Sequence, residues 1–182
     1  MRDRLAGWAY AAGWGAVRAI PLPVAAAGFR AGADYATRRG GRGVRRLREN
    51  LRRVVGPGLP EAELDLLVRD GMRSYLRYWL DSFRLPSRPE THGTYFQLVD
   101  GDEERLAAAV ADGHGVVLAL PHAGNWDAAG AFVTAHGWGL VTVAERLRPE
   151  SLYERFVAYR ESLGMEILPL HGGQRPPLDV LA

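Results

Sequence analysis

His122 and Asp127 are the two residues whose types and spacing most directly suggest chemistry. A neutral imidazole can take a proton from an alcohol near neutral pH, and a carboxylate bonded to its other ring nitrogen fixes the required tautomer. The surrounding turn, residues 121–127, contains no Ser or Cys that could act as a nucleophile. The attacking hydroxyl would then belong to a bound substrate, and acyl transfer to an alcohol fits this arrangement. The alternative is an ordinary loop in which these residues only begin the next helix.

The apolar run of residues 115–120 precedes this turn and predicts a buried strand, because it contains the β-branched pair Val116–Val117 and is bounded by Gly and Pro. Asn125 is a suitable N-cap for a helix that begins directly after the turn. We therefore expect His122 at the carboxyl end of a strand and Asp127 one helical turn away. Open α/β sheets bind their ligands at this edge.

Strands and helices alternate through the second half of the chain. Besides residues 115–120, the patterns predict strands at 95–99, 140–144 and 165–168, and helices at 102–112, 125–136 and 149–163. This alternation predicts an α/β fold with a mainly parallel sheet flanked by helices. A further helix begins at Pro177 and the sequence then stops. We therefore expect the chain to be the N-terminal part of a longer fold.

Residues 1–92 are predicted to form a helical region, and residues 93–182 the α/β core. Residues 1–55 hold 12 Arg and 3 acidic residues, a net charge of +9, whereas the remainder has a net charge of −7. The apolar segments 4–20 and 24–35 are too short and too charged to span a membrane. They suit an interfacial helical pair, with Trp8, Tyr10 and Trp14 at the headgroup boundary.

Residues 41–55 predict a basic amphipathic helix, and an anionic membrane surface is the expected partner. A solvated helix face is the alternative. The Arg-rich run 38–53 would oppose translocation, which argues against a signal peptide and favours peripheral binding at the cytoplasmic face of the cell membrane. Nucleic acid is not expected as a partner, because the region carries no nucleic-acid-binding motif. No cysteine is present, and no His, Asp or Glu cluster has metal-ligand spacing, so we predict no metal site.

Further polar residues are expected near His122. Glu145 and Arg146 follow the predicted strand 140–144 and are candidates for substrate binding at the same sheet edge, together with Asn125. A solvated loop is the alternative for Glu145 and Arg146. Arg160 lies inside the predicted helix 149–163, where the alternative is a surface ion pair with a neighbouring glutamate.

The spacing His-x4-Asp after a strand resembles the signature of the glycerolipid acyltransferases. Residues 118–130 resemble the branch that contains the bacterial lipid A late acyltransferases, and residues 44–51 are similar to its basic helix ending in Asn-Leu. Residues 143–149 and 156–164 resemble its second block, which ends in Arg-x3-Gly. These two segments are most similar to the actinobacterial phosphatidylinositol mannoside acyltransferases. The matches occur in the expected order over nearly the whole chain.

The resemblance implies an acyl-CoA-dependent O-acyltransferase of glycolipid biosynthesis. Acyl-CoA, as co-substrate, would give its acyl chain to a hydroxyl of a phosphatidylinositol mannoside, and no cofactor is implied. His122 would be the base, Asp127 the carboxylate that orients it, and Arg160 a second-block residue serving substrate or carboxylate. The alternatives are a lipid A-type or lysophospholipid acyltransferase and a non-catalytic peripheral membrane module.

Overall fold

The computed structural model describes residues 13–94, 98–121, 123–173 and 176–181, and these fall into two compact units. Residues 13–84 form the helical unit, and the residues from Leu85 onward form the α/β unit. The boundary between the units lies at 84/85, whereas the sequence predicted 92/93. Two short 3-10 helices, η1 (Leu85–Ser87) and η2 (Pro89–Thr94), belong to the α/β unit.

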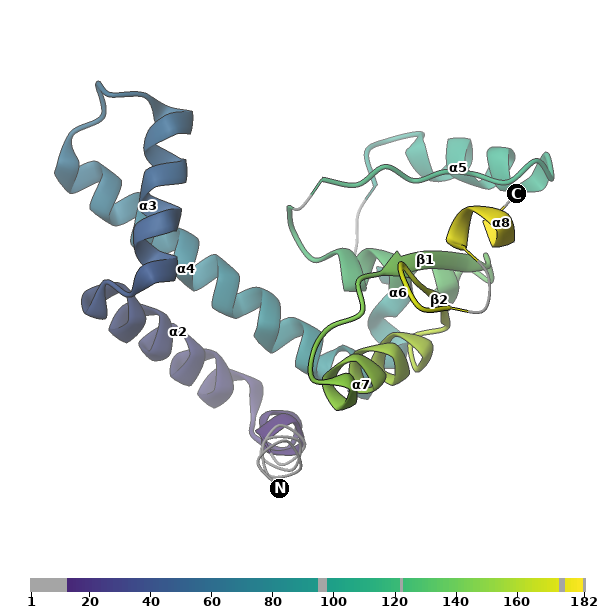
Figure 1. Ribbon diagram of the computed structural model, residues 1–182, viewed down its shortest axis with the longest axis horizontal. Helices are drawn as coiled ribbons and strands as arrows, with labels where there is room; N and C mark the ends of the chain where they lie inside the picture. Colours follow the sequence, from purple (N-terminus) through teal and green to yellow (C-terminus); the bar gives the residue numbers. More distant parts are fainter. Residues whose placement is uncertain (1–12, 95–97, 122, 174–175, 182) are drawn as a thin grey trace. The chain divides into compact units, whose positions relative to one another are not determined.

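The helical unit is built on one long helix. Both α2 (Leu22–Arg39) and α3 (Arg42–Val55) pack along α4 (Glu61–Arg84), as Figure 1 shows. The buried core consists of the α4 residues Leu64, Val68 and Leu80 and the α2 residues Ala25 and Ala33. The small alanines on α2 allow close packing of the two helices.

Local sequence explains where these helices begin and end. Pro21 and Pro23 suit the start of α2, because the first helical amides need no partner within the helix. Gly40 ends α2 in the left-handed conformation with a φ of 59°. The basic helix predicted at 41–55 is confirmed as α3. Two of its arginines face α4: Arg48 forms ion pairs with Glu61 and Asp65, and Arg52 with Glu61.

Residues 13–19 are helical and are tied to the carboxyl end of α4. Trp14 Nε1 and Arg18 Nε donate to the Phe83 carbonyl at 3.0 and 2.9 Å, and the Trp14 and Phe83 rings are 5.0 Å apart. Trp14 thus packs within the helical unit, and its position at the headgroup boundary stays a prediction. Trp8 and Tyr10 lie outside the described residues. Over the described ranges, no helix has the length and hydrophobicity needed to cross a membrane.

The α/β unit contains a two-stranded parallel sheet. β1 (Leu140–Ala144) pairs with β2 (Met165–Pro169) in the register Leu140 to Met165, and α7 (Glu150–Glu161) connects them. The helix α6 (Trp126–Ala135) packs against the sheet at Gly130, where an added Cβ would clash with the Met165 side chain of β2 and lie 3.2 Å from Leu140 of β1. The remaining helices are α5 (Asp102–Ala111) and α8 (Pro177–Leu181). The predicted alternation and parallel pairing are confirmed for these elements.

The predicted central strand at 115–120 was wrong. Residues 115–120 have no regular secondary structure, and all are exposed, with Val117 95% accessible. A strand needs a neighbour to bond its amides and carbonyls, and in the described part of the chain only β1 and β2 pair. The described part is therefore mostly helical rather than built on a large sheet. Of the strand predicted at 95–99, residues 95–97 lie outside the described residues, and 98–99 form no strand.

Candidate functional site

The start of α6 holds two of the predicted site residues. The Asn125 side chain accepts a hydrogen bond from the Ala128 amide at 3.1 Å, so the predicted N-cap is confirmed. Asp127 lies in the first helical turn and is only 2% exposed. A carboxylate at this position is favoured by the partial positive charge of the helix N-terminus. His122 lies outside the described residues, so its pairing with Asp127 stays a prediction.

Arg160 forms an ion pair with Asp127. Its Nε donates to Asp127 Oδ1 at 3.1 Å, although the two residues are 33 positions apart and lie on α7 and α6. The Arg160 side chain is 13% exposed and that of Asp127 2%, so the pair is largely removed from water. This contact is not the surface ion pair between Arg160 and a neighbouring glutamate that was the alternative interpretation. In such an environment, loss of Arg160 or of Asp127 removes an ion pair that is largely shielded from water, which is strongly destabilising.

Two aromatic rings enclose the Arg160 guanidinium. Its Cζ lies 4.1 Å from the centroid of the Trp126 ring and 5.9 Å from that of Phe156. Cation–π contacts of this kind hold the planar group in one orientation. The sequence analysis did not select either aromatic residue. The available signals were the position of Trp126 next to Asp127 and the four-residue spacing from Phe156 to Arg160, which places both on one face of α7.

Gly164 helps to fix α7 relative to α6. Its φ of 86° is one that side-chain-bearing residues rarely adopt, and an added Cβ would lie 3.0 Å from Thr134 Cβ. Thr134, near the end of α6, donates a hydrogen bond to the Leu163 carbonyl at 2.6 Å. This turn joins the ends of the two helices that carry Asp127 and Arg160. The structure therefore explains why the last residue of the Arg-x3-Gly block is a glycine: a side chain at this position would not fit between the helix ends.

Glu145 and Arg146 follow β1, as expected, but Arg146 has other partners. Its guanidinium bonds both carboxylate oxygens of Glu150 at 2.7–3.0 Å, and its Nη1 donates to the Gly172 carbonyl at 3.1 Å. These hydrogen bonds lower the pKa of the Glu150 carboxyl and raise the pKa of Arg146. Arg146 thus links the segments that follow β1 and β2. Glu145 is exposed. Substrate binding by either residue stays a prediction.

The structure therefore groups three of the predicted residues, Asn125, Asp127 and Arg160, around the start of α6. The protein-family model of the bacterial lipid A biosynthesis acyltransferases matches residues 2–181. The chain belongs to this family. The resemblance predicted from residues 118–130 and from the Arg-x3-Gly block is confirmed.

This chain is similar to curated proteins from mycobacteria. A phosphatidylinositol mannoside acyltransferase of Mycolicibacterium smegmatis is 53% identical over 175 residues, which cover 95% of this chain and 56% of that protein. A protein of the same name from Mycobacterium tuberculosis strain H37Rv is 51% identical over 176 residues, covering 96% and 55%. The chain thus spans about half the length of the curated relatives it matches.

Proposed function

We propose that this chain carries the general base of an acyltransferase that transfers a fatty acyl chain from acyl-CoA to a hydroxyl of a phosphatidylinositol mannoside. The observation that carries the proposal is the buried Asp127 at the start of α6, five residues after His122, in a chain 51–53% identical to phosphatidylinositol mannoside acyltransferases. The donor and the acceptor are inferred from the resemblance and from the names of those relatives.

His122 removes the proton from the acceptor hydroxyl as its oxygen attacks the thioester carbonyl carbon. The new carbon–oxygen bond forms, the carbon–sulfur bond breaks, and His122 returns the proton to the leaving thiolate of CoA. Asp127 selects the imidazole tautomer and stabilises the imidazolium. Arg160 is a positioning residue, because it holds the Asp127 carboxylate at 3.1 Å. In this proposal, backbone amides at the start of α6 donate hydrogen bonds to the tetrahedral oxyanion.

An assay of acyl-CoA turnover with several acceptors tests this function. The 182-residue chain is incubated with acyl-CoA and a phosphatidylinositol mannoside, a lipid A precursor or a lysophospholipid, and the acylated lipid and the free thiol are both measured. We expect at least a tenfold higher kcat/KM for the mannoside. Equal or faster transfer to another acceptor would replace the proposed substrate. Vesicle binding without transfer to any acceptor would favour the non-catalytic membrane module.

We further propose that the exposed basic face of α3 binds the cytoplasmic face of the cell membrane. This basic face consists of Arg42, Arg45, Arg46 and Arg53, all exposed, whereas Arg48 and Arg52 pair with α4 carboxylates. The helical unit has 14 arginines and 7 acidic residues, a net charge of +7. Near an anionic leaflet each basic residue contributes about 1 kcal/mol of attraction.

Replacing all four arginines of the basic face with Gln is expected to weaken binding to anionic vesicles by about 100-fold or more. Binding to neutral vesicles changes little, and the difference shrinks as salt rises, because charge attraction is screened. Cosedimentation at low and high salt measures both effects. The matched control replaces the same four residues with Lys and should bind like the wild type. An equal loss on neutral vesicles would contradict the electrostatic role.

A further inference from the structure

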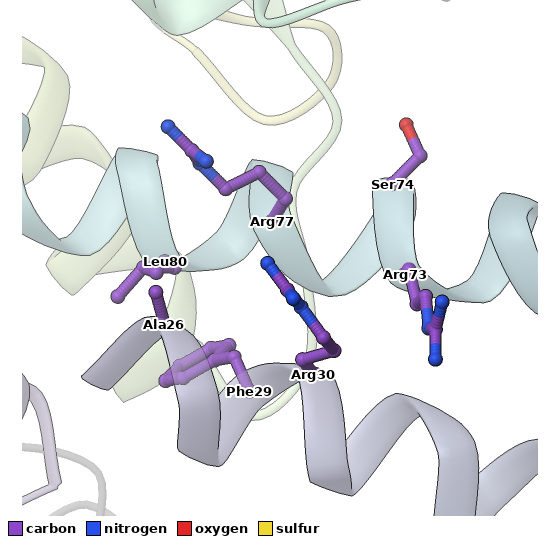
Figure 2. Close-up of a pocket in the computed structure, with 7 residues that line it drawn as sticks. All are labelled: Ala26, Phe29, Arg30, Arg73, Ser74, Arg77 and Leu80. Carbon is purple, nitrogen blue, oxygen red and sulfur yellow. The ribbon is translucent and has the colours of Figure 1, made fainter. Parts of the chain in front are cut away.

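A groove lies between α2 and α4, both of which belong to the helical unit, whereas the residues assigned to catalysis belong to the α/β unit. Its volume is about 340 Å³. Seven residues line it: Ala26, Phe29 and Arg30 of α2, and Arg73, Ser74, Arg77 and Leu80 of α4. Figure 2 shows Arg30 extending from α2 toward α4, whereas Phe29, Ala26 and Leu80 lie together at one end. The lining thus combines three cations with an apolar patch and contains no acidic residue.

The three arginines of the groove differ in their partners. Arg73 donates to both carboxylate oxygens of Asp34 at 2.7 and 2.8 Å, and these bonds hold the pKa of Asp34 below its ordinary value. Arg77 donates to Asp81 at 2.7 and 2.8 Å. Arg30 is exposed, and no carboxylate of a described residue lies within 4 Å of it. Arg30 is therefore the cation whose charge the described residues leave uncompensated.

The apolar end of the groove indicates which class of anionic ligand the groove would bind. Leu80 is fully buried, and Phe29 and Ala26, which lie beside it in Figure 2, are partly exposed. An inorganic anion would leave this surface in contact with water, whereas an amphiphile would cover it. The volume of about 340 Å³ is at the lower end of ligand pockets, which run from roughly 300 to 1,000 Å³. It suits the phosphate and glycerol of one lipid, with the rest of the acyl chains outside.

We propose that the α2–α4 groove binds one anionic glycerophospholipid, with Arg30 on its phosphodiester and Phe29 against its glycerol and first methylenes. A guanidinium presents two parallel donors that match two phosphate oxygens. Arg73 and Arg77, which pair with Asp34 and Asp81, also line the groove. Neither carboxylate is among the lining residues. This site goes beyond the proposed acyl transfer, because it lies on the helical unit and needs no acyl donor.

Calorimetric titration with short-chain lipids, kept below the concentration at which they form micelles, tests the site without a membrane surface. The probes are dihexanoyl phosphatidylglycerol, dihexanoyl phosphatidylcholine and glycerol phosphate. We expect phosphatidylglycerol to bind at least tenfold more tightly than either of the others. Equal binding of glycerol phosphate would show a site for soluble phosphate esters and would overturn the lipid assignment. No binding of phosphatidylglycerol would overturn the site itself.

Three variants identify the residue responsible. Arg30→Gln is expected to weaken phosphatidylglycerol binding by about 10- to 100-fold, which is the range for a hydrogen bond to a charged group. Arg38→Gln removes the same charge from an exposed position of α2 outside the groove and should weaken binding by no more than about fivefold. Arg30→Lys keeps the charge but loses the fork, so an intermediate affinity is expected. Equal losses for Arg30→Gln and Arg38→Gln would contradict the proposal. Circular dichroism confirms that each variant is folded.

Discussion

Replacing His122 with alanine is expected to lower acyl transfer by about 10²- to 10⁴-fold, and by more if the imidazole carries out both proton transfers. The alanine variant retains Asp127 and Arg160 but has no group that can take the hydroxyl proton. Initial rates of thiol release from acyl-CoA, measured with a phosphatidylinositol mannoside as acceptor, give the size of the effect. Vesicle binding should stay unchanged, because the basic face lies on α3.

His114→Ala is the matched control for this experiment. His114 lies eight residues earlier, its side chain is 84% exposed, and its Nδ1 is 3.0 Å from the Asp112 carboxylate. Losing this surface contact should leave the rate within a factor of two of the wild type. Wild-type turnover by a folded His122→Ala protein would exclude His122 as the base. A similar loss in His114→Ala would show that the assay reports general damage to this loop.

The helices and the two paired strands were predictable because each carries its own signals. β1 was predicted with its observed bounds, and α3 and α6 within one or two residues, from apolar periodicity and from Asn125 as a cap. The run 115–120 shows the limit of such signals. Its apolar residues indicate a need for burial, but strand pairing depends on a second segment, and the described chain provides no such partner.

The candidate site was predictable in its residue types but not in its pairing. The position of Asp127 in the first turn of α6 followed from the spacing to Asn125. Its ion pair with Arg160 joins positions 33 residues apart, and periodicity along one helix cannot indicate such a contact. Arg146 illustrates the reverse case. Its partner Glu150 lies four residues later, a spacing that the sequence shows directly, and this pair occupies a guanidinium that was expected to bind substrate.

Replacing Asp127 with asparagine is expected to reduce acyl transfer by up to about 10⁴-fold while keeping the shape of the site. The amide can support the wrong imidazole tautomer and cannot stabilise an imidazolium. Its Oδ1 can still accept from Arg160 Nε, so part of the 3.1 Å contact is retained. Initial rates measured beside urea unfolding curves separate the loss of chemistry from the loss of stability. A wild-type rate in Asp127→Asn would contradict the orienting role.

Two variants decide whether Asp127 acts in catalysis or only in folding. They are Arg160→Gln and the double variant that combines Arg160→Gln with Asp127→Asn. Arg160→Gln removes the ion pair with Arg160 from a carboxylate that is 2% exposed, so we expect a loss of about 3–5 kcal/mol in unfolding free energy. Arg146→Gln breaks the exposed pair with Glu150 and should cost far less. Asp127→Asn combined with Arg160→Gln removes both charges and should recover much of the lost stability. Activity should stay low in this double variant, because the imidazole still has no carboxylate. Recovery of activity together with stability would show that Asp127 serves only the fold.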